Sequence, residues 1–143
     1  MSTPAQDIFS DVVAALAAIS RVNGFATEVE LVRTGPVPPG SLARFPALVA
    51  QVERVRTSSL PARRRRCAMR LRVTAHVRGA DEAAARHAMA ALLGDIDRAL
   101  LADPTRGARA ALTEAVERTA ESTFGETGVR AAALYDIVWH ETL

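Results

Sequence analysis

Hydrophobic positions recur with the period of an α-helix in two segments of the chain. The first follows Thr3-Pro4, where a capping hydroxyl precedes a proline at the first helical position, and it stops at Asn23-Gly24. The second follows Asp81, a suitable N-cap, and ends at Asp103-Pro104. The apolar stripe of the first consists of Ile8, Val12, Leu16, Ile19 and Val22, and that of the second of Ala85, Met89, Leu92, Leu93, Ile96 and Leu100. The pattern therefore predicts two helices, each with one buried face.

Between these helices the pattern changes to a period of two residues, which is typical of β-strands. A short first strand is expected within 25–35, and a second strand over 47–56 with Leu48, Ala50 and Val52 on one face. The intervening stretch, 36–46, holds four of the seven prolines and is expected to be irregular. The stretch 57–65 is expected to be the loop of a hairpin.

The clearest alternation covers residues 66–78. One parity is apolar: Cys67, Met69, Leu71, Val73, Ala75 and Val77. The other is polar: Arg66, Arg70, Arg72, Thr74, His76 and Arg78. Such alternation predicts a strand with one face against the core and the other face uncovered.

The last forty residues allow two interpretations at first. Leu112, Val116, Ala120 and Phe124 suit a strand, whereas Leu112, Ala115, Val116 and Thr119 suit a helix, so 108–123 stays open between them. Its threonines favour the strand. In the closing segment, Tyr135, Ile137 and Trp139 share one parity, and Leu134 and Val138 the other. Apolar residues on both parities predict a central or partner-covered strand, and Tyr135 and Trp139 belong either to the core or to an interface.

The elements follow the order α-β-β-β-α-β-β. We expect an α+β fold in which a mixed, mostly antiparallel sheet of four to five strands packs with two α-helices. The 143 residues suit one domain, 1–143, and the hydrophobic fraction of 49% with 24% charged residues is ordinary for a soluble protein. No apolar run approaches the ~20 residues that a membrane span requires. The first nine residues have no basic region and no cleavable apolar segment, so we do not expect secretion.

The sequence offers few groups for catalysis or metal binding. A single cysteine, Cys67, excludes an internal disulfide and a cysteine-based zinc cluster, and its parity indicates a small buried side chain. His76, His87 and His140 have no partners at ligand spacing. Phosphate-binding glycine motifs and nucleophile motifs are absent from the sequence, and residues 95 and 97 are two apart on a helix, so their carboxylates diverge. We expect a protein that is not an enzyme and that holds no cofactor and no metal.

Arginine is the one unusual feature of the composition. All 18 basic residues are arginine, and the net charge is only +2. Six of them form the candidate contact site: Arg63, Arg64, Arg65, Arg66, Arg70 and Arg72. They contact either phosphates or an acidic partner, or they form a solvated hairpin loop and a polar strand face. No aromatic residue neighbours them in the sequence, although stacking often accompanies nucleic-acid binding.

Four stretches of the chain are similar to a known family, the phage tail terminator proteins. They are "DVVAALAAISRVNGFATEVELV" (11–32), "RFPALVAQV" (44–52), "RLRVTAHVRGADEAAARHAMAALLGDIDRALLADPTRG" (70–107) and "AALYDIVWHET" (132–142). They resemble that family's opening helix and first strand, proline-marked second strand, strand–break–helix unit and closing strand.

The resemblance implies a structural protein of a phage or phage-like particle. It would form a hexameric ring that caps the tail tube, stops its polymerisation and offers an attachment surface to the head or neck connector protein. Such a ring would be assembled in the host cytoplasm and reside at the head-proximal end of the virion tail, and DNA would pass through it without sequence-specific binding. The arginine cluster would then face the tube or neck protein, because a channel lined with it would hold DNA too firmly.

A different class of function also fits the arginines. A small basic nucleic-acid-binding domain would use the arginine-rich hairpin to contact phosphates. Such a domain is expected to be a monomer or dimer that co-purifies with nucleic acid, whereas the ring is expected to have six-fold mass and no bound nucleic acid.

Overall fold

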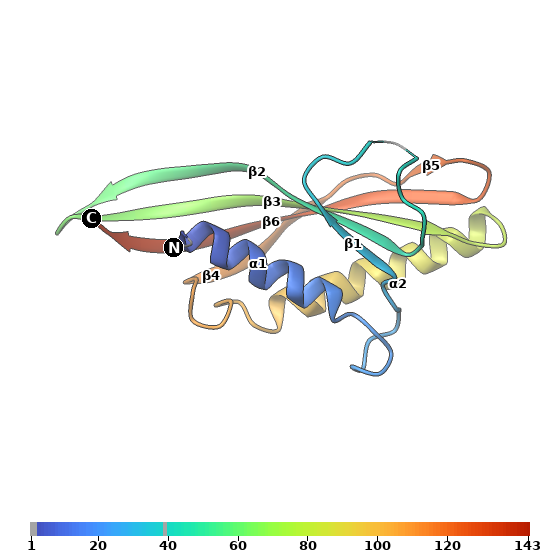
Figure 1. The fold of residues 1–143 in the computed structure, drawn as a ribbon, viewed down its shortest axis with the longest axis horizontal. Helices are drawn as coiled ribbons and strands as arrows, with labels where there is room; N and C mark the ends of the chain where they lie inside the picture. Colours follow the sequence, from blue (N-terminus) through green and yellow to red (C-terminus); the bar gives the residue numbers. More distant parts are fainter. Residues whose placement is uncertain (1–2, 39) are drawn as a thin grey trace.

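Two helices lie across one face of a twisted sheet (Figure 1). The computed structural model describes residues 3–38 and 40–143. The elements are α1 (Pro4–Ala17), β1 (Leu31–Thr34), β2 (Ala47–Leu60), β3 (Arg64–Arg78), α2 (Glu82–Leu101), β4 (Leu112–Arg118), β5 (Ser122–Phe124) and β6 (Gly128–Thr142). None of the described helices is long and apolar enough to cross a membrane.

The sheet has the strand order β1-β2-β3-β6-β4, and β5 pairs with the first part of β6. Strands β1 and β2 are parallel, and every other pair is antiparallel. The expected α+β fold with a mixed, mostly antiparallel sheet is confirmed. The sheet has six strands because the segment between α2 and β6 forms two strands, β4 and β5, where one was expected.

Helix α1 begins as predicted and ends earlier. The Thr3 hydroxyl accepts a hydrogen bond from the Gln6 amide, and the Gln6 side chain accepts one from the Thr3 amide, which makes a capping box. The helix stops at Ala17, and the chain then turns, so the prediction that Val22 belongs to the buried stripe is wrong: it is 93% exposed. Asn23 and the left-handed Gly24 belong to that turn, beyond the helix end.

The hairpin of β2 and β3 is longer than the sequence predicts. Only Pro61–Arg63 turn the chain, with Ala62 and Arg63 in the left-handed region, and pairing resumes at once between Leu60 and Arg64. The predicted loop over 57–65 is therefore wrong, and three of the four consecutive arginines lie in β3. The error has a physical cause. This end of the sheet lies beyond α1 (Figure 1), so both faces of the strands are solvated there, and serine, threonine and arginine are as compatible with a solvated strand as with a loop.

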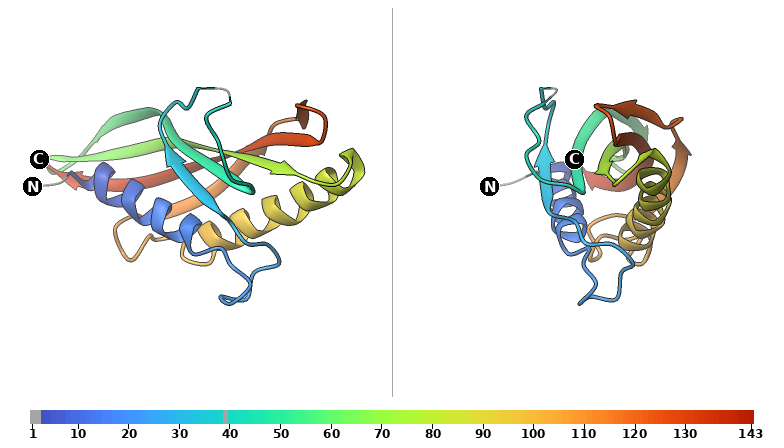
Figure 2. Two further views of the ribbon diagram at one scale, coloured as in Figure 1. Left: turned by 45° about the vertical axis from the view of Figure 1, so that its right-hand side comes forward. Right: turned by 90° about the vertical axis from the view of Figure 1, so that its right-hand side faces the viewer.

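One hydrophobic core lies between the helices and the facing side of the sheet (Figure 2). The apolar parity predicted for β3 and the stripe predicted for α2 are both buried, as expected. Strand β6 is buried on both faces, which confirms it as a central strand. Tyr135 and Trp139 both belong to this core, so the interface alternative does not apply to the isolated chain.

Strand β4 settles the open question for 108–123 in favour of a strand, but its predicted face is wrong. Thr113 is buried opposite Ile137 of β6, while Leu112 and Val116 are exposed. Side chains on a strand alternate, so placing Thr113 towards the core sends Leu112 to the other side. A bulge between Ala115 and Glu117 then breaks the alternation near Val116.

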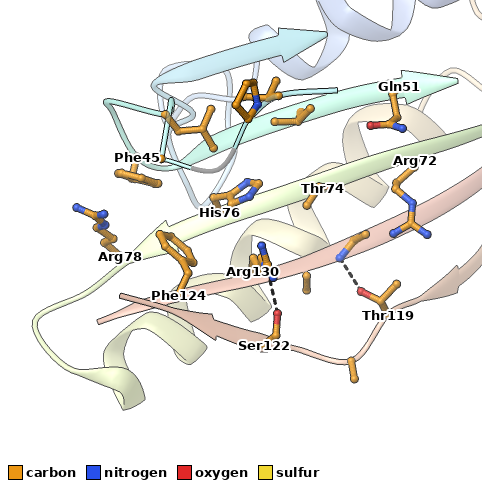
Figure 3. A pocket seen from close by; sticks show the side chains of 18 residues that line it. Phe45, Gln51, Arg72, Thr74, His76, Arg78, Thr119, Ser122, Phe124 and Arg130 are labelled. Atoms are coloured by element: carbon orange, nitrogen blue, oxygen red, sulfur yellow. Dashed lines mark hydrogen bonds between the residues drawn. The ribbon is translucent and has the colours of Figure 1, made fainter. Parts of the chain in front are cut away.

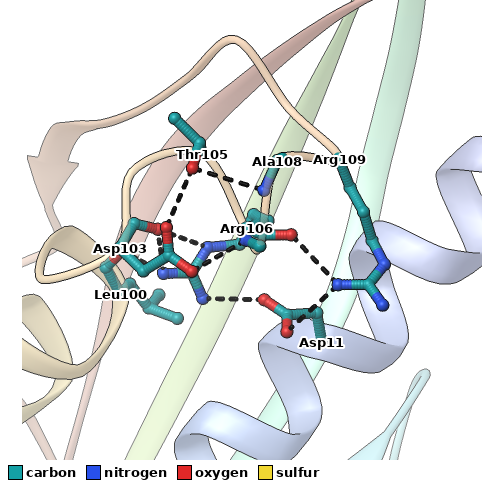
Figure 4. Close-up of polar contacts among 8 residues, drawn as sticks. Asp11, Leu100, Asp103, Thr105, Arg106, Ala108 and Arg109 are labelled. Carbon is teal, nitrogen blue, oxygen red and sulfur yellow. Dashed lines mark hydrogen bonds and ion pairs between the residues drawn. The ribbon is translucent and has the colours of Figure 1, made fainter.

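A buried arginine joins the two helices (Figure 4). The Arg106 side chain is 1% exposed, although nothing in its sequence context distinguishes it. Its guanidinium donates to the carbonyls of Leu100, at 2.5 Å, and Asp103, at 2.9 Å from Nε, both at the end of α2. Its Nη1 also lies 3.3 Å from Asp11 Oδ2 of α1. The Arg106 side chain thus supplies hydrogen-bond donors to carbonyls at the end of α2 and also pairs with a carboxylate of α1.

We expect Arg106→Met to lower the free energy of unfolding by about 2–4 kcal/mol, because two carbonyls and the Asp11 carboxylate lose their donor. Urea unfolding monitored by circular dichroism measures the change. Arg109→Ala is the matched control, since Arg109 is half-exposed and lies 3.9 Å from the same carboxylate. Its loss should cost less than about 1 kcal/mol. Equal effects of the two substitutions would contradict the bridging role of Arg106.

Candidate interaction surfaces

The face of the sheet opposite the helices, called here the outer face, carries most of the predicted arginines. By strand parity Arg64, Arg66, Arg70 and Arg72 point to this face. Arg65 points to the helix-covered side, where it pairs with Glu141. Arg63 lies in the hairpin turn, so the structure divides the six candidate residues among three environments.

Three of the six arginines are paired within the chain. The Nε atoms of Arg70 and Arg72 lie 2.6 Å from Asp136 Oδ1 and 2.5 Å from Glu53 Oε1, and Arg65 Nη2 lies 2.5 Å from Glu141 Oε2. For Arg65, the hydrogen bond with Glu141 raises the pKa of the guanidinium. The remaining three, Arg63, Arg64 and Arg66, have no ion pair with any described residue. Of the six predicted residues, those without an ion pair thus lie at the hairpin end.

A depression of about 190 Å³ lies on the outer face near this end. Its lining includes Arg66 and Arg70 from β3, two further arginines from β2, Arg54 and Arg56, and the carboxylate of Glu114 from β4. Arg54 and Arg56 are not among the six residues predicted from the sequence. The available signal was their alternation with Val55, which places both on the face shared with Arg70.

A larger cavity, of about 500 Å³, lies towards the other end of the outer face (Figure 3). One wall is the irregular crossing from β1 to β2, which contributes Phe45, and the opposite wall is the segment from β4 to β5, which contributes Phe124. The Arg78 guanidinium lies 4.5 Å from the centroid of the Phe45 ring and 5.6 Å from that of Phe124. No pattern in the sequence predicts this cluster, because the two rings are 79 positions apart and only the fold brings them together.

His76 lies on the floor of this cavity between the two walls (Figure 3). Its ring meets Phe124 edge-on, at 5.7 Å between centroids and 71° between planes. Its Nδ1 is buried and has no hydrogen-bond partner among the described residues. Burial, and secondarily the charge of Arg130, lowers the pKa of His76, so the ring is neutral at physiological pH.

Both edges of the sheet offer unpaired backbone. Strand β1 covers β2 only as far as Ala50, so residues 51–60 of β2 pair on one side alone. Strand β4 ends the sheet on the other side. An unpaired edge presents a row of amide and carbonyl groups that another strand can bind.

The two neighbouring carboxylates of α2 have separate structural partners. Asp95 accepts hydrogen bonds from Ala26 and Thr27, whereas Asp97 accepts one from the Tyr135 hydroxyl, which confirms that these two carboxylates act separately. Burial raises the pKa of the Cys67 thiol. Among the described residues, no group of three or more histidine, cysteine or acidic side chains is placed to hold a metal ion.

Comparison with models of known protein families finds no match to this chain, and comparison with curated protein sequences finds none either.

The environment of His76 gives a prediction about its titration. We expect its pKa to lie below 6.5 and to rise in Arg130→Ala, because that substitution removes a nearby positive charge. An NMR titration of the ring protons measures both values, and Arg21→Ala, far from the cavity, should leave them unchanged. The imidazole of His76 binds a proton more readily in the unfolded chain than in the folded one. The free energy of unfolding should therefore decrease as the pH falls through 6.5. An unshifted His76 would contradict its burial.

Proposed function

We propose that this chain is the ring-forming terminator of a phage or phage-like tail. It caps the tail tube, stops its polymerisation and provides the surface to which the head or neck connector attaches. The observation that carries this proposal is the complementarity of the two free sheet edges. A closed ring of identical subunits needs two different patches that fit one another, because the contact between neighbours is head-to-tail.

The directions of the edge strands suit such a contact. Strand β4 is antiparallel to β6, which is antiparallel to β3, which is antiparallel to β2, so β4 and β2 run in opposite directions. A neighbour related by rotation about a ring axis nearly parallel to the strands keeps its strand direction. Its β4 would then lie antiparallel beside β2, and the free backbone groups of both edges would be satisfied.

The side chains of the two edges are complementary in charge. On β2 the outer face of the edge carries Arg54 and Arg56, while on β4 it carries Glu114 and Glu117. Cross-strand pairs of opposite charge stabilise a sheet, and like charges in that position destabilise it. The edges therefore favour pairing of β2 with β4 over pairing of two copies of the same edge.

Exposed hydrophobic side chains gather at the same two edges. Four of the seven large hydrophobic residues exposed among those described lie there: Val52 (37%), Val55 (46%), Leu112 (43%) and Val116 (41%). Both edges also contain a bulge, between Val52 and Arg54 and between Ala115 and Glu117. A bulge bends its strand and increases the twist, so an added copy is rotated relative to the first, as closure of a ring requires.

The unpaired arginines at the hairpin end provide the docking surface in this proposal. Arg63, Arg64 and Arg66 lie together at the tip of the hairpin and have no described acidic partner, so they are available to carboxylates of a tube or neck protein. Arginine is suited to such contacts because its planar guanidinium binds a carboxylate through two parallel hydrogen bonds. DNA would pass through the ring without sequence-specific contacts.

The ring predicts a specific response to charge reversal at the edges. Arg54→Glu with Arg56→Glu places like charges opposite one another and should reduce a six-fold native mass to that of a monomer. Adding Glu114→Arg and Glu117→Arg restores opposite charges and should restore the ring. Sedimentation velocity at low salt measures the mass, and Arg21→Glu with Arg44→Glu is the control of equal charge change, because both residues are exposed and lie outside the strands. A monomeric wild type, or an edge variant that keeps the six-fold mass, would contradict the proposed ring.

A separate prediction concerns docking. Reversing Arg63, Arg64 and Arg66 to glutamate should leave the ring mass unchanged while weakening its attachment to the tube or neck at low salt, where charge contacts are least screened. Electron micrographs of particles from producing cells would show tails of uncontrolled length or tails without heads. Normal tails in this variant would exclude the arginines as the docking surface, whereas the control pair Arg21→Glu and Arg44→Glu should give normal tails.

The second candidate function is a basic nucleic-acid-binding domain. It is favoured by the depression near the hairpin end, whose lining contains more arginines than acidic residues. The arginines there include Arg54, Arg56 and Arg66. This candidate requires affinity for duplex DNA that falls with a log–log salt slope of about −0.9 for each phosphate contacted. The absorbance ratio of the purified protein at 260 and 280 nm, read with its native mass, separates the two candidates.

A further inference from the structure

The cavity on the outer face has the charge of an anion-binding site. Arg72, Arg78 and Arg130 line it, and of the described residues that line it none is acidic. The other lining groups are mostly apolar, including Leu42 and Val49. Its volume of about 500 Å³ lies within the range of clefts that enclose a bound ligand. An occupant should therefore combine negative charge with an apolar group.

Two of the three guanidiniums have hydrogen-bonding capacity to spare. Arg130 donates from Nε to the Ser122 hydroxyl, at 3.1 Å, and has no described acidic partner. Arg78 is held over the two phenylalanine rings and likewise has no described ion pair. Arg72 donates to Glu53 from Nε, at 2.5 Å, and its two terminal nitrogens have no described partner, so it offers a second but weaker position for a carboxylate. The end of the cavity near Arg130 is consequently the stronger site for a carboxylate.

The floor of the cavity contains an unsatisfied polar atom. His76 lies directly opposite Arg130 in the β3–β6 register, and its buried Nδ1 has no described partner. A buried polar group without a hydrogen bond is costly. The atom has almost no exposed surface, so a carboxylate reaches it only after the ring turns, and it then accepts a hydrogen bond from the Nδ1–H tautomer; this contact adds to those of the arginines at the same end of the cavity.

The aromatic rings favour a peptide over a nucleotide as the occupant. Phe45 and Phe124 pack on one another, with 5.7 Å between centroids and a tilt of 32°. Arg78 lies over both rings, and His76 meets Phe124 edge-on. A base would need a free ring face for stacking, whereas an aliphatic side chain needs only the apolar walls.

We propose that this cavity binds an extended acidic segment of a partner protein, with carboxylates at Arg130 and Arg72 and an aliphatic side chain between them. Arg72 and His76 are four residues apart on β3, or about 13 Å. An extended peptide repeats its side chains on one face every ~6.6 Å, so an acidic–x–aliphatic–x–acidic segment matches this spacing. The site lies within one chain and does not depend on ring formation.

The experiment uses the full chain, labelled with ¹⁵N, in an NMR titration at low salt. The probe is the peptide acetyl-Glu-Ser-Leu-Ser-Glu-amide. The comparison probes are acetyl-Lys-Ser-Leu-Ser-Lys-amide and adenosine monophosphate. The proposal requires that the acidic peptide binds more tightly than both and shifts the resonances of His76 and Arg130.

Two variants localise the binding. Arg130→Ala removes a charged donor and should weaken the acidic peptide by roughly tenfold or more. Ala120→Glu places a carboxylate on the exposed rim of the cavity, without disturbing the core, and should compete with the peptide for Arg130. Arg21→Ala, the matched loss of an arginine elsewhere, should leave binding unchanged, and thermal unfolding of all three checks that each is folded.

Three results would overturn the proposal. The first is absence of saturable binding of the acidic peptide, and the second is equal affinity for the basic peptide. The third is tighter binding of adenosine monophosphate that both cavity variants abolish, which would make the cavity a nucleotide site. Because these measurements use the monomeric chain or the ring alike, failure here leaves the proposed ring untouched, and failure of the ring leaves the peptide site untouched.

Discussion

The organisation of this protein depends on the burial of one face of β3 by two helices. The apolar parity of β3 packs against α1 and α2, and together they form the single core cluster. Helices cover only this face, and α1 begins short of the hairpin tip (Figure 1). The opposite parity therefore has no helix to pack against, and it consists mainly of arginine with Thr74 and His76. The open outer face follows from this one-sided burial, whereas the free edges follow from the short β1 and the terminal position of β4.

One-sided burial explains why arginine is used where it is. On the outer face, cross-strand and neighbouring carboxylates of β6 and β2 hold Arg70 and Arg72 in place. Guanidinium keeps its charge when half-buried and binds carboxylates in a fixed geometry, which suits a face that is polar but not fully solvated. Where the sheet extends beyond the helices, the same residue type is left unpaired. The chain thus uses arginine both to organise the outer face and to present positive charge at its end.

The sequence predicts those parts of the fold in which alternation and burial coincide. The stripes of α2 and β3 were predicted residue by residue, because a single period accounts for each. The errors lie where burial is partial. Val22 continues a helical period beyond Ala17, where the helix ends. Residues 57–60 look like a loop because three of the four are serine or threonine, which a solvated strand also accommodates. The face of β4 was wrong because Thr113, not Leu112, occupies the core position.

The candidate surfaces were predictable only in part, for a related reason. The consecutive arginines are visible in the sequence, but their division between the turn, the outer face and the helix-covered side depends on where β3 begins. Arg106 and the cluster of Phe45, Arg78 and Phe124 are produced by contacts between distant segments, and no local pattern marks them.

The three open surfaces are not equivalent, and their chemistry separates their roles. The edges combine unpaired backbone with exposed valine and leucine, which suits a lasting contact between copies. The hairpin end offers charge with little apolar area, which suits a contact that salt can weaken. The cavity combines both within a volume of about 500 Å³, which suits one short segment rather than a whole surface. A subunit that joins its own copies, docks on a second protein and holds a segment of another needs these three kinds of contact, and a one-sided sheet leaves room for all of them.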